Sequence, residues 1–303
     1  MANAINRGWK LTKSSWQVVR LDKELAVLPV LSILVSLVVT LGLFAAGFAL
    51  LASSSYLNIT TGNTGVAGGS YTAPAWLNLT ALFVIYFIFT FISNFFGGAL
   101  ICGATERFKG GNPTVKSSLA GARRRIYPLA GFSLLMTTVG VLLQLIEERV
   151  PFAGKIAVWL LGAAWSIANV FALPIIVLSD HAVKPLEATK LSVTTIKKIW
   201  GESLVVNTGI AIIGLLGTII YALVMGLVLG LLIAVHVPTS LAIASIALSF
   251  AGLIALLILF STFSAVAKAA LYHYAVTGSA PDNFNTELLH STINLKKARK
   301  IFG

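Results

Sequence analysis

Residues 25–53 read LAVLPVLSILVSLVVTLGLFAAGFALLAS, a run that contains no charged side chain. A helix needs roughly 20 mostly apolar residues to cross about 30 Å of hydrocarbon, so this run is long enough to span a membrane. The whole chain has the same character, because 57% of its 303 residues are hydrophobic and only 11% are charged. A soluble domain carries about 25% charged residues. We therefore predict an integral membrane protein.

Five further apolar runs are long enough to cross a bilayer as helices. They cover residues 76–102, 127–146, 153–179, 203–235 and 239–272, approximately. Together with the first run they predict an all-α fold with six transmembrane helices, arranged as three hairpins.

Each outgoing span follows a basic segment in which apolar residues recur at helical spacing. In the second of these segments one face carries Val115, Leu119, Ala122 and Ile126. The third repeats the design with Leu186, Thr189, Val193, Ile196 and Trp200. We predict a threefold repeat of a cytoplasmic amphipathic helix followed by a transmembrane hairpin. The repeat units cover about residues 5–102, 112–180 and 184–276, and a basic cytoplasmic tail follows at 277–303.

The basic residues gather on one side of the predicted spans. Of the 22 Lys and Arg, the N-terminal segment holds five and the loop after the second span six; the loop after the fourth span and the C-terminal tail hold four each. Short loops rich in Lys and Arg stay in the cytoplasm. We predict a multi-pass protein of the plasma membrane with both termini cytoplasmic.

Basic side chains of the amphipathic segments are our candidates for contact with anionic lipid headgroups of the cytoplasmic leaflet. They are Arg123, Arg124, Arg125, Lys190, Lys197 and Lys198. The alternative is that these segments only close the cytoplasmic end of the bundle, because a helix packed on protein shows the same apolar stripe. Positive charge beside a span already follows from the topology, so we expect no nucleic-acid partner.

Several residues inside the predicted spans are candidates for helix packing. Gly226 and Gly230 form a GxxxG motif, which lets two helix backbones approach closely. Their partner is either another span of the same chain or a second copy, so a homo-oligomer is possible. Asn169 and Asn207 can form hydrogen bonds between helices; alternatively, such polar residues line a polar path through the bundle.

The sequence does not indicate catalysis. It contains no HExxH zinc motif, nucleophile elbow, phosphate-binding loop or dinucleotide fingerprint. The four histidines are scattered, and the single cysteine, Cys102, excludes an internal disulfide. We expect no enzyme activity, no cofactor and no metal. The leading hypothesis is a membrane-organising or partner-binding subunit that contacts anionic lipid; the alternative is a channel or carrier for a small neutral solute or a lipid.

Three stretches carry a family resemblance. They are INRGWKLTKSSWQVVRLDKELAVLP at 5–29, ALPIIVLSDHAVKPLEATKLSVTTIKKIWGESLVV at 172–206 and LYHYAVTGSAPDNF at 271–284. They resemble an uncharacterised bacterial and archaeal family of six-helix integral membrane proteins, although Ser179 stands where that family has an acidic residue. The plan is also distantly similar to the membrane domain of some glycerophosphodiester phosphodiesterases. The resemblance implies a membrane fold and no activity.

Overall fold

The structure is a computed structural model that describes residues 14–16, 18–20, 22–53, 75–199, 203–235, 238–279 and 281. All regular secondary structure in these residues is helical. The long helices are α2 (Lys23–Ser53), α3 (Ala75–Phe108), α5 (Ile126–Glu147), α6 (Phe152–Ala168), α9 (Ser203–Ala234) and α10 (Thr239–Thr277). The shorter ones are α4 (Val115–Arg123), α7 (Ala172–Leu178) and α8 (Pro185–Ile199).

Six helical segments of the described chain are long and apolar enough to cross a membrane. They are Glu24–Gly47, Trp76–Phe108, Ile126–Glu147, Phe152–Leu178, Gly214–Leu232 and Ser240–Thr277. The fourth comprises α6 and α7 together. The chain is therefore a multi-pass membrane protein, and the predicted all-α fold with six apolar segments is confirmed.

Large apolar side chains are exposed along these segments. Phe44 of α2, Leu223 of α9 and Leu248 of α10 are 76%, 68% and 75% exposed. Soluble monomers rarely expose such continuous apolar surface. These faces fit contact with lipid, because hydrocarbon tails solvate apolar side chains without cost.

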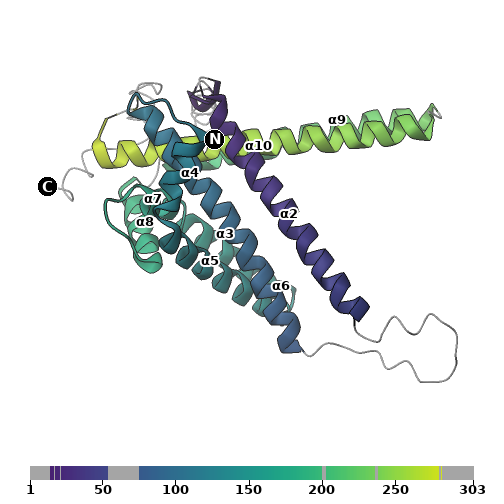
Figure 1. Ribbon diagram of the computed structural model, residues 1–303, viewed down its shortest axis with the longest axis horizontal. Helices are drawn as coiled ribbons and strands as arrows, with labels where there is room; N and C mark the ends of the chain where they lie inside the picture. The colour runs from purple at the N-terminus through teal and green to yellow at the C-terminus, as the bar shows by residue number, and fades with distance from the viewer. Residues whose placement is uncertain are drawn as a thin grey trace.

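The helices splay from a common junction. In Figure 1, α2, α3, α5 and α6 extend from this junction in a similar direction, whereas the α9–α10 pair extends in a different one. Helices α4, α7 and α8 lie at the end where the two groups meet. Along the chain, α2 packs against α3, α5 against α6, and α9 against α10.

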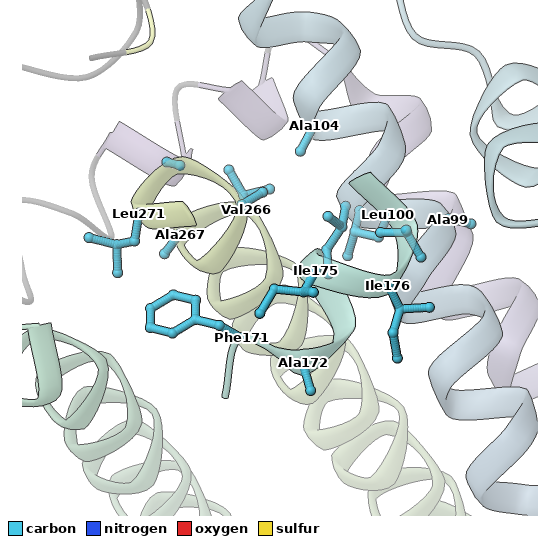
Figure 2. Close-up of a cluster of buried hydrophobic side chains, with 14 of the residues drawn as sticks. Ala99, Leu100, Ala104, Phe171, Ala172, Ile175, Ile176, Val266, Ala267 and Leu271 are labelled. Atoms are coloured by element: carbon cyan, nitrogen blue, oxygen red, sulfur yellow. The ribbon is translucent and has the colours of Figure 1, made fainter. Parts of the chain in front are cut away.

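The buried core lies at this junction. Figure 2 shows the short helix α7 between α3 and α10, with Ile175 and Ile176 pointing towards its neighbours. Alanines alternate with larger side chains at the contact, which lets the helices approach closely. The core residues labelled in Figure 2 are Ala99, Leu100, Ala104, Phe171, Ala172, Ile175, Ile176, Val266, Ala267 and Leu271, and each is at most 3% exposed.

Helix α4 is shorter than its sequence pattern suggests. Thr114 caps its first turn and forms a capping box with Ser117. The chain turns at Arg124, and α5 begins at Ile126. Ala122 is therefore buried on the α4 face, whereas Ile126 belongs to the next helix and is 36% exposed. The predicted apolar stripe therefore includes one residue, Ile126, that does not belong to α4.

The buried face of α8 overlaps the predicted one, since Thr189 and Ile196 belong to both, but it is shifted towards Ala188 and Ser192. Its buried residues are Ala188, Thr189, Ser192 and Ile196, whereas Leu186 is 61% exposed. Small and hydroxyl side chains form this face because it contacts α7 and polar backbone groups beside it. Trp200, which the pattern placed on the same face, lies outside the described residues.

Candidate functional site

The fourth apolar segment is not one continuous helix. The helix α6 ends at Ala168 and α7 begins at Ala172, whereas the sequence predicts an unbroken span over 153–179. Pro174 explains the interruption, because proline has no N–H to donate to the carbonyl of Val170. The N–H of Asn169 closes the end of α6 by donating to the carbonyls of Trp165 and Ser166, at 3.2 and 3.3 Å.

Helix α8 satisfies polar groups at this break. The Thr189 hydroxyl donates to the Asn169 side-chain oxygen at 2.7 Å. The N–H of Phe171 donates to the Ser192 hydroxyl at 3.1 Å. Non-helical backbone at membrane depth is tolerated only where protein buries it or where it lines a cavity. The polar face of α8 therefore fastens this short helix to the break and stabilises an otherwise costly interruption.

A polar cavity of about 440 Å³ opens beside the break, between α3, α5, α6, α7 and α10. Its apolar lining includes Ile101, Phe132 and Met136. Its polar lining comes from three parts of the chain that are far apart in sequence. These polar residues are Ser93, Asn94, Ser166, Asn169, Ser261, Ser264 and Lys268.

An apolar groove of about 290 Å³ adjoins this cavity where α3 passes α10. The groove lies between α2, α3 and α10 and is lined mainly by residues such as Ile33, Phe96 and Leu257. Ser93 and Ser261 line both spaces. The two spaces therefore form a polar compartment and an apolar compartment with a common wall.

Lys268 faces the polar cavity from the interior of α10, and no acidic residue lines that cavity. In the described part of the chain Lys268 forms no ion pair or hydrogen bond. The predicted span 239–272 puts Lys268 near its end, where a basic residue is ordinary, so the sequence did not single it out as a site residue. The available signal was its position as the one charged residue between Thr239 and Thr277.

Asn94 links two helices at the cavity wall. Its side-chain amide donates to the Ser133 hydroxyl at 2.9 Å, and that hydroxyl donates to the Leu129 carbonyl at 2.8 Å. Asn94 and Asn169 thus form hydrogen bonds and also line the cavity, so the two roles considered for such residues are compatible. The side chain of Asn207 lies outside the described residues.

Three carboxylates at the basic end of the molecule face internal partners, whereas Asp180 and Glu187 are exposed. Asp22, before α2, forms a two-point ion pair with Arg107 at the end of α3. Glu24 accepts a hydrogen bond from the Val115 N–H at 2.9 Å, and Glu106 accepts one from the Ser117 hydroxyl at 2.8 Å. These contacts join α2, α3 and α4, and they leave few negative charges to neutralise the surface cations.

The six basic candidates have different environments. Arg123, Arg124, Lys190 and Lys197 are exposed. Arg125 is half-buried and donates to the Ser179 carbonyl, which lies at the end of α7. Arg125 therefore fixes α7 to the start of α5 and is less available to lipid. The Lys198 side chain is outside the described residues.

Gly226 and Gly230 do not contact another described helix of this chain, because a Cβ added at either would meet no atom within 4 Å. The contact between α9 and α10 instead uses Gly214 and Gly217, whose added Cβ atoms would lie 3.3 Å from Phe260. Among the described residues this chain therefore offers no partner for the GxxxG motif, and a contact with a second copy stays a prediction.

The double substitution Gly226→Leu and Gly230→Leu is expected to leave the melting temperature unchanged, since the new side chains meet no atom of the chain. If the motif is a dimer seam, the mass of the protein in detergent should fall by half. As a control, Gly214→Leu and Gly217→Leu should lower the melting temperature, because both push against Phe260. If Gly226→Leu with Gly230→Leu lowers the melting temperature while the mass stays constant, then these glycines pack against the chain itself and the prediction is wrong.

Among the described residues, no three His, Cys, Asp or Glu side chains come together as metal ligands. The sequence profile described as "Family of unknown function (DUF6159)" matches residues 77–282. This region contains the broken span, the cavity and both short helices α4 and α8. Comparisons with curated proteins and with solved structures give no match. The resemblance to the glycerophosphodiester phosphodiesterase membrane domain stays a prediction.

Proposed function

The chain belongs to the family of unknown function whose profile it matches, and we propose that it is a non-catalytic membrane protein that contacts anionic lipid through its basic end. In this proposal its six spans form three hairpins in the plasma membrane. The basic end and both termini face the cytoplasm, where α4 and α8 lie among the lipid headgroups. The protein organises lipid, or holds a protein partner, at that surface.

The observation that carries this proposal is that acidic and basic side chains at the basic end differ in their partners. Asp22, Glu24 and Glu106 face internal partners. By contrast, the four exposed candidates for lipid contact have no ion pair among the described residues; they are Arg123, Arg124, Lys190 and Lys197. A basic side chain near an anionic membrane surface contributes about 1 kcal/mol to binding.

The residues of α4 and α8 that pack on protein are distinct from the exposed basic residues proposed to contact lipid. Ser118 and Ala122 are buried on one face of α4, and Ala188 and Ser192 are buried on one face of α8. The exposed basic side chains are therefore presented by helices whose position is already fixed. This arrangement supports a surface that recognises charge rather than one that inserts deeply into the bilayer.

Replacing Arg123, Arg124, Lys190 and Lys197 together by Gln is expected to reduce the preference of the protein for anionic lipid several-fold. The measurement is electron paramagnetic resonance of the full chain in bilayers, with spin-labelled phosphatidylglycerol compared with spin-labelled phosphatidylcholine. The fraction of each lipid that is immobilised at the protein gives the preference. Salt should reduce it in the unsubstituted protein, because ions screen exposed charges.

The matched control replaces Arg149 and Lys155, which are exposed at the other end of the molecule, by Gln. The preference for anionic lipid should then change little in bilayers whose anionic lipid is confined to the basic side. An unchanged preference in the fourfold variant would show that these side chains are simply solvated, and the proposal would fail.

A carrier for a lipid or small solute is the second candidate. The broken span beside a polar cavity favours it, because carriers commonly place their binding sites at interrupted helices. Purified protein in liposomes should then accelerate transfer of a fluorescent lipid or a neutral solute across the bilayer. Liposomes that exchange neither faster than protein-free ones would exclude this candidate for the solutes tested.

A further inference from the structure

The cavity around Lys268 offers unused hydrogen-bond donors. The Lys268 ammonium has no partner among the described residues, and neither do the hydroxyls of Ser93, Ser166 and Ser264, which line the same cavity. An ammonium group only donates hydrogen bonds, and hydroxyls can both donate and accept them. A partially buried charge without a partner is costly, so the cavity is suited to an anion that would pair with Lys268.

The position of Lys268 along α10 fits the headgroup level of the membrane. The residue lies about 44 Å from Thr239, at 1.5 Å per residue, whereas the hydrocarbon core is about 30 Å thick. A helix tilted by about 40°, the upper end of the common range, still places it about 34 Å along the membrane normal. With the topology proposed above, on which this step rests, Lys268 lies near the phosphates of the cytoplasmic leaflet.

The adjoining groove adds an apolar compartment. It shares Ser93 and Ser261 with the polar cavity, and its other lining residues include Ile33, Phe96 and Leu257. A headgroup bound at Lys268 could extend an acyl chain past this common wall into the groove. The pair of compartments therefore matches an amphiphile better than a compact soluble ion.

We propose that this cavity binds the oxyanion of an anionic amphiphile, with a phospholipid of the cytoplasmic leaflet as its source. Lys268 pairs with the oxyanion, the unpartnered hydroxyls bind its remaining oxygens, and the α2–α3–α10 groove holds one acyl chain. Lys268 is the single charged residue in the lining, which suits a singly charged headgroup rather than a polyphosphate. The site is separate from the exposed cations of α4 and α8.

Native mass spectrometry of the full chain in a mild detergent tests the site, because it counts bound lipids and does not depend on topology. The ligands are phosphatidylglycerol, phosphatidylcholine as the uncharged comparison, and inorganic phosphate as the soluble source of the same chemistry. The variants are Lys268→Met, Lys268→Arg and Ser261→Leu. Arg149→Met is the matched control, since it removes an exposed charge at the other end.

We expect one phosphatidylglycerol to bind in preference to phosphatidylcholine. Lys268→Met should weaken that binding about tenfold or more, because a hydrogen bond to a charged group is lost. Lys268→Arg and Arg149→Met should retain it. Ser261→Leu, which places a bulky side chain on the common wall, should weaken phosphatidylglycerol binding and leave any phosphate binding unchanged.

Unchanged phosphatidylglycerol binding by folded Lys268→Met would overturn the site. If that variant does not fold, unchanged binding by Ser261→Leu overturns it instead. Binding of inorganic phosphate that depends on Lys268, without binding of phosphatidylglycerol, would keep the oxyanion site and reject lipid as its source. The fourfold Gln variant of α4 and α8 should bind this one lipid normally, so failure of the surface proposal and failure of this site are distinguishable.

Discussion

Replacing Arg107 with Met is expected to destabilise the protein by about 3–5 kcal/mol, because it leaves a buried carboxylate without its counter-ion. Asp22 is that carboxylate, and its side chain is only 4% exposed, whereas the side chain of Arg107 is 23% exposed. Asp22 precedes α2 and Arg107 ends α3, so the pair joins two helices at the basic end. Losing the cation therefore also loosens this junction.

Replacing Asp22 and replacing Arg107 should destabilise the protein by different amounts. Asp22→Asn is expected to cost less than Arg107→Met, because the more exposed guanidinium can recover water when the carboxylate is removed. The double variant, Asp22→Asn with Arg107→Met, should be more stable than Arg107→Met alone, since no buried charge remains. Melting of the four proteins in detergent gives the comparison. Equal losses for the two single variants would contradict a buried, cation-dependent Asp22.

Replacing Gly103 with Leu is expected to cost about 3 kcal/mol or more and to reduce the yield of folded protein. Gly103 lies where α3 contacts α2 and α4, and an added Cβ would lie 2.7 Å from Leu25 and would also overlap Ser118. Overpacking of a close contact costs about 1–3 kcal/mol for small insertions, and Leu adds further atoms in the same direction.

The control for this prediction is the same substitution at Gly42. A Cβ there meets nothing within 4 Å, and the residue is exposed on α2. Gly42→Leu should therefore fold with the melting temperature of the unsubstituted protein. If Gly103→Leu and Gly42→Leu both have the melting temperature of the unsubstituted protein, then the close approach of α2, α3 and α4 does not stabilise the junction.

The long spans could be predicted because their composition alone requires a membrane. The run 25–53 corresponds closely to α2, which covers Lys23–Ser53. The break in the fourth span could not be predicted from composition, because residues 153–179 are apolar on both sides of it. Pro174 was the local signal, but proline also occurs within α2 at Pro29 without ending that helix. Partners such as Thr189 and Ser192 decide the outcome, and they come from another helix.

The candidate site was less predictable than the fold. A lysine near the end of the predicted span 239–272 is ordinary, so the sequence did not single out Lys268, although α10 continues beyond that end to Thr277. Tyr274 lies in this extension and is fully buried by protein contacts. Likewise, a GxxxG spacing does not specify which glycines meet a neighbour, and Gly214 and Gly217 do so where Gly226 does not. Cavities formed by several separate segments depend on tertiary structure in the same way.

We propose that the basic end of this six-span protein faces the cytoplasm, and the accessibility of single cysteines to a reagent outside the cell measures this. Glu187 of α8 and Glu148 after α5 are both exposed, and they lie on opposite sides of the proposed membrane. Each is replaced by Cys in a Cys102→Ala background and treated with an impermeant maleimide. We expect labelling of Glu148→Cys in intact cells and labelling of Glu187→Cys only after the cells are opened. Labelling of Glu187→Cys in intact cells would contradict the proposal.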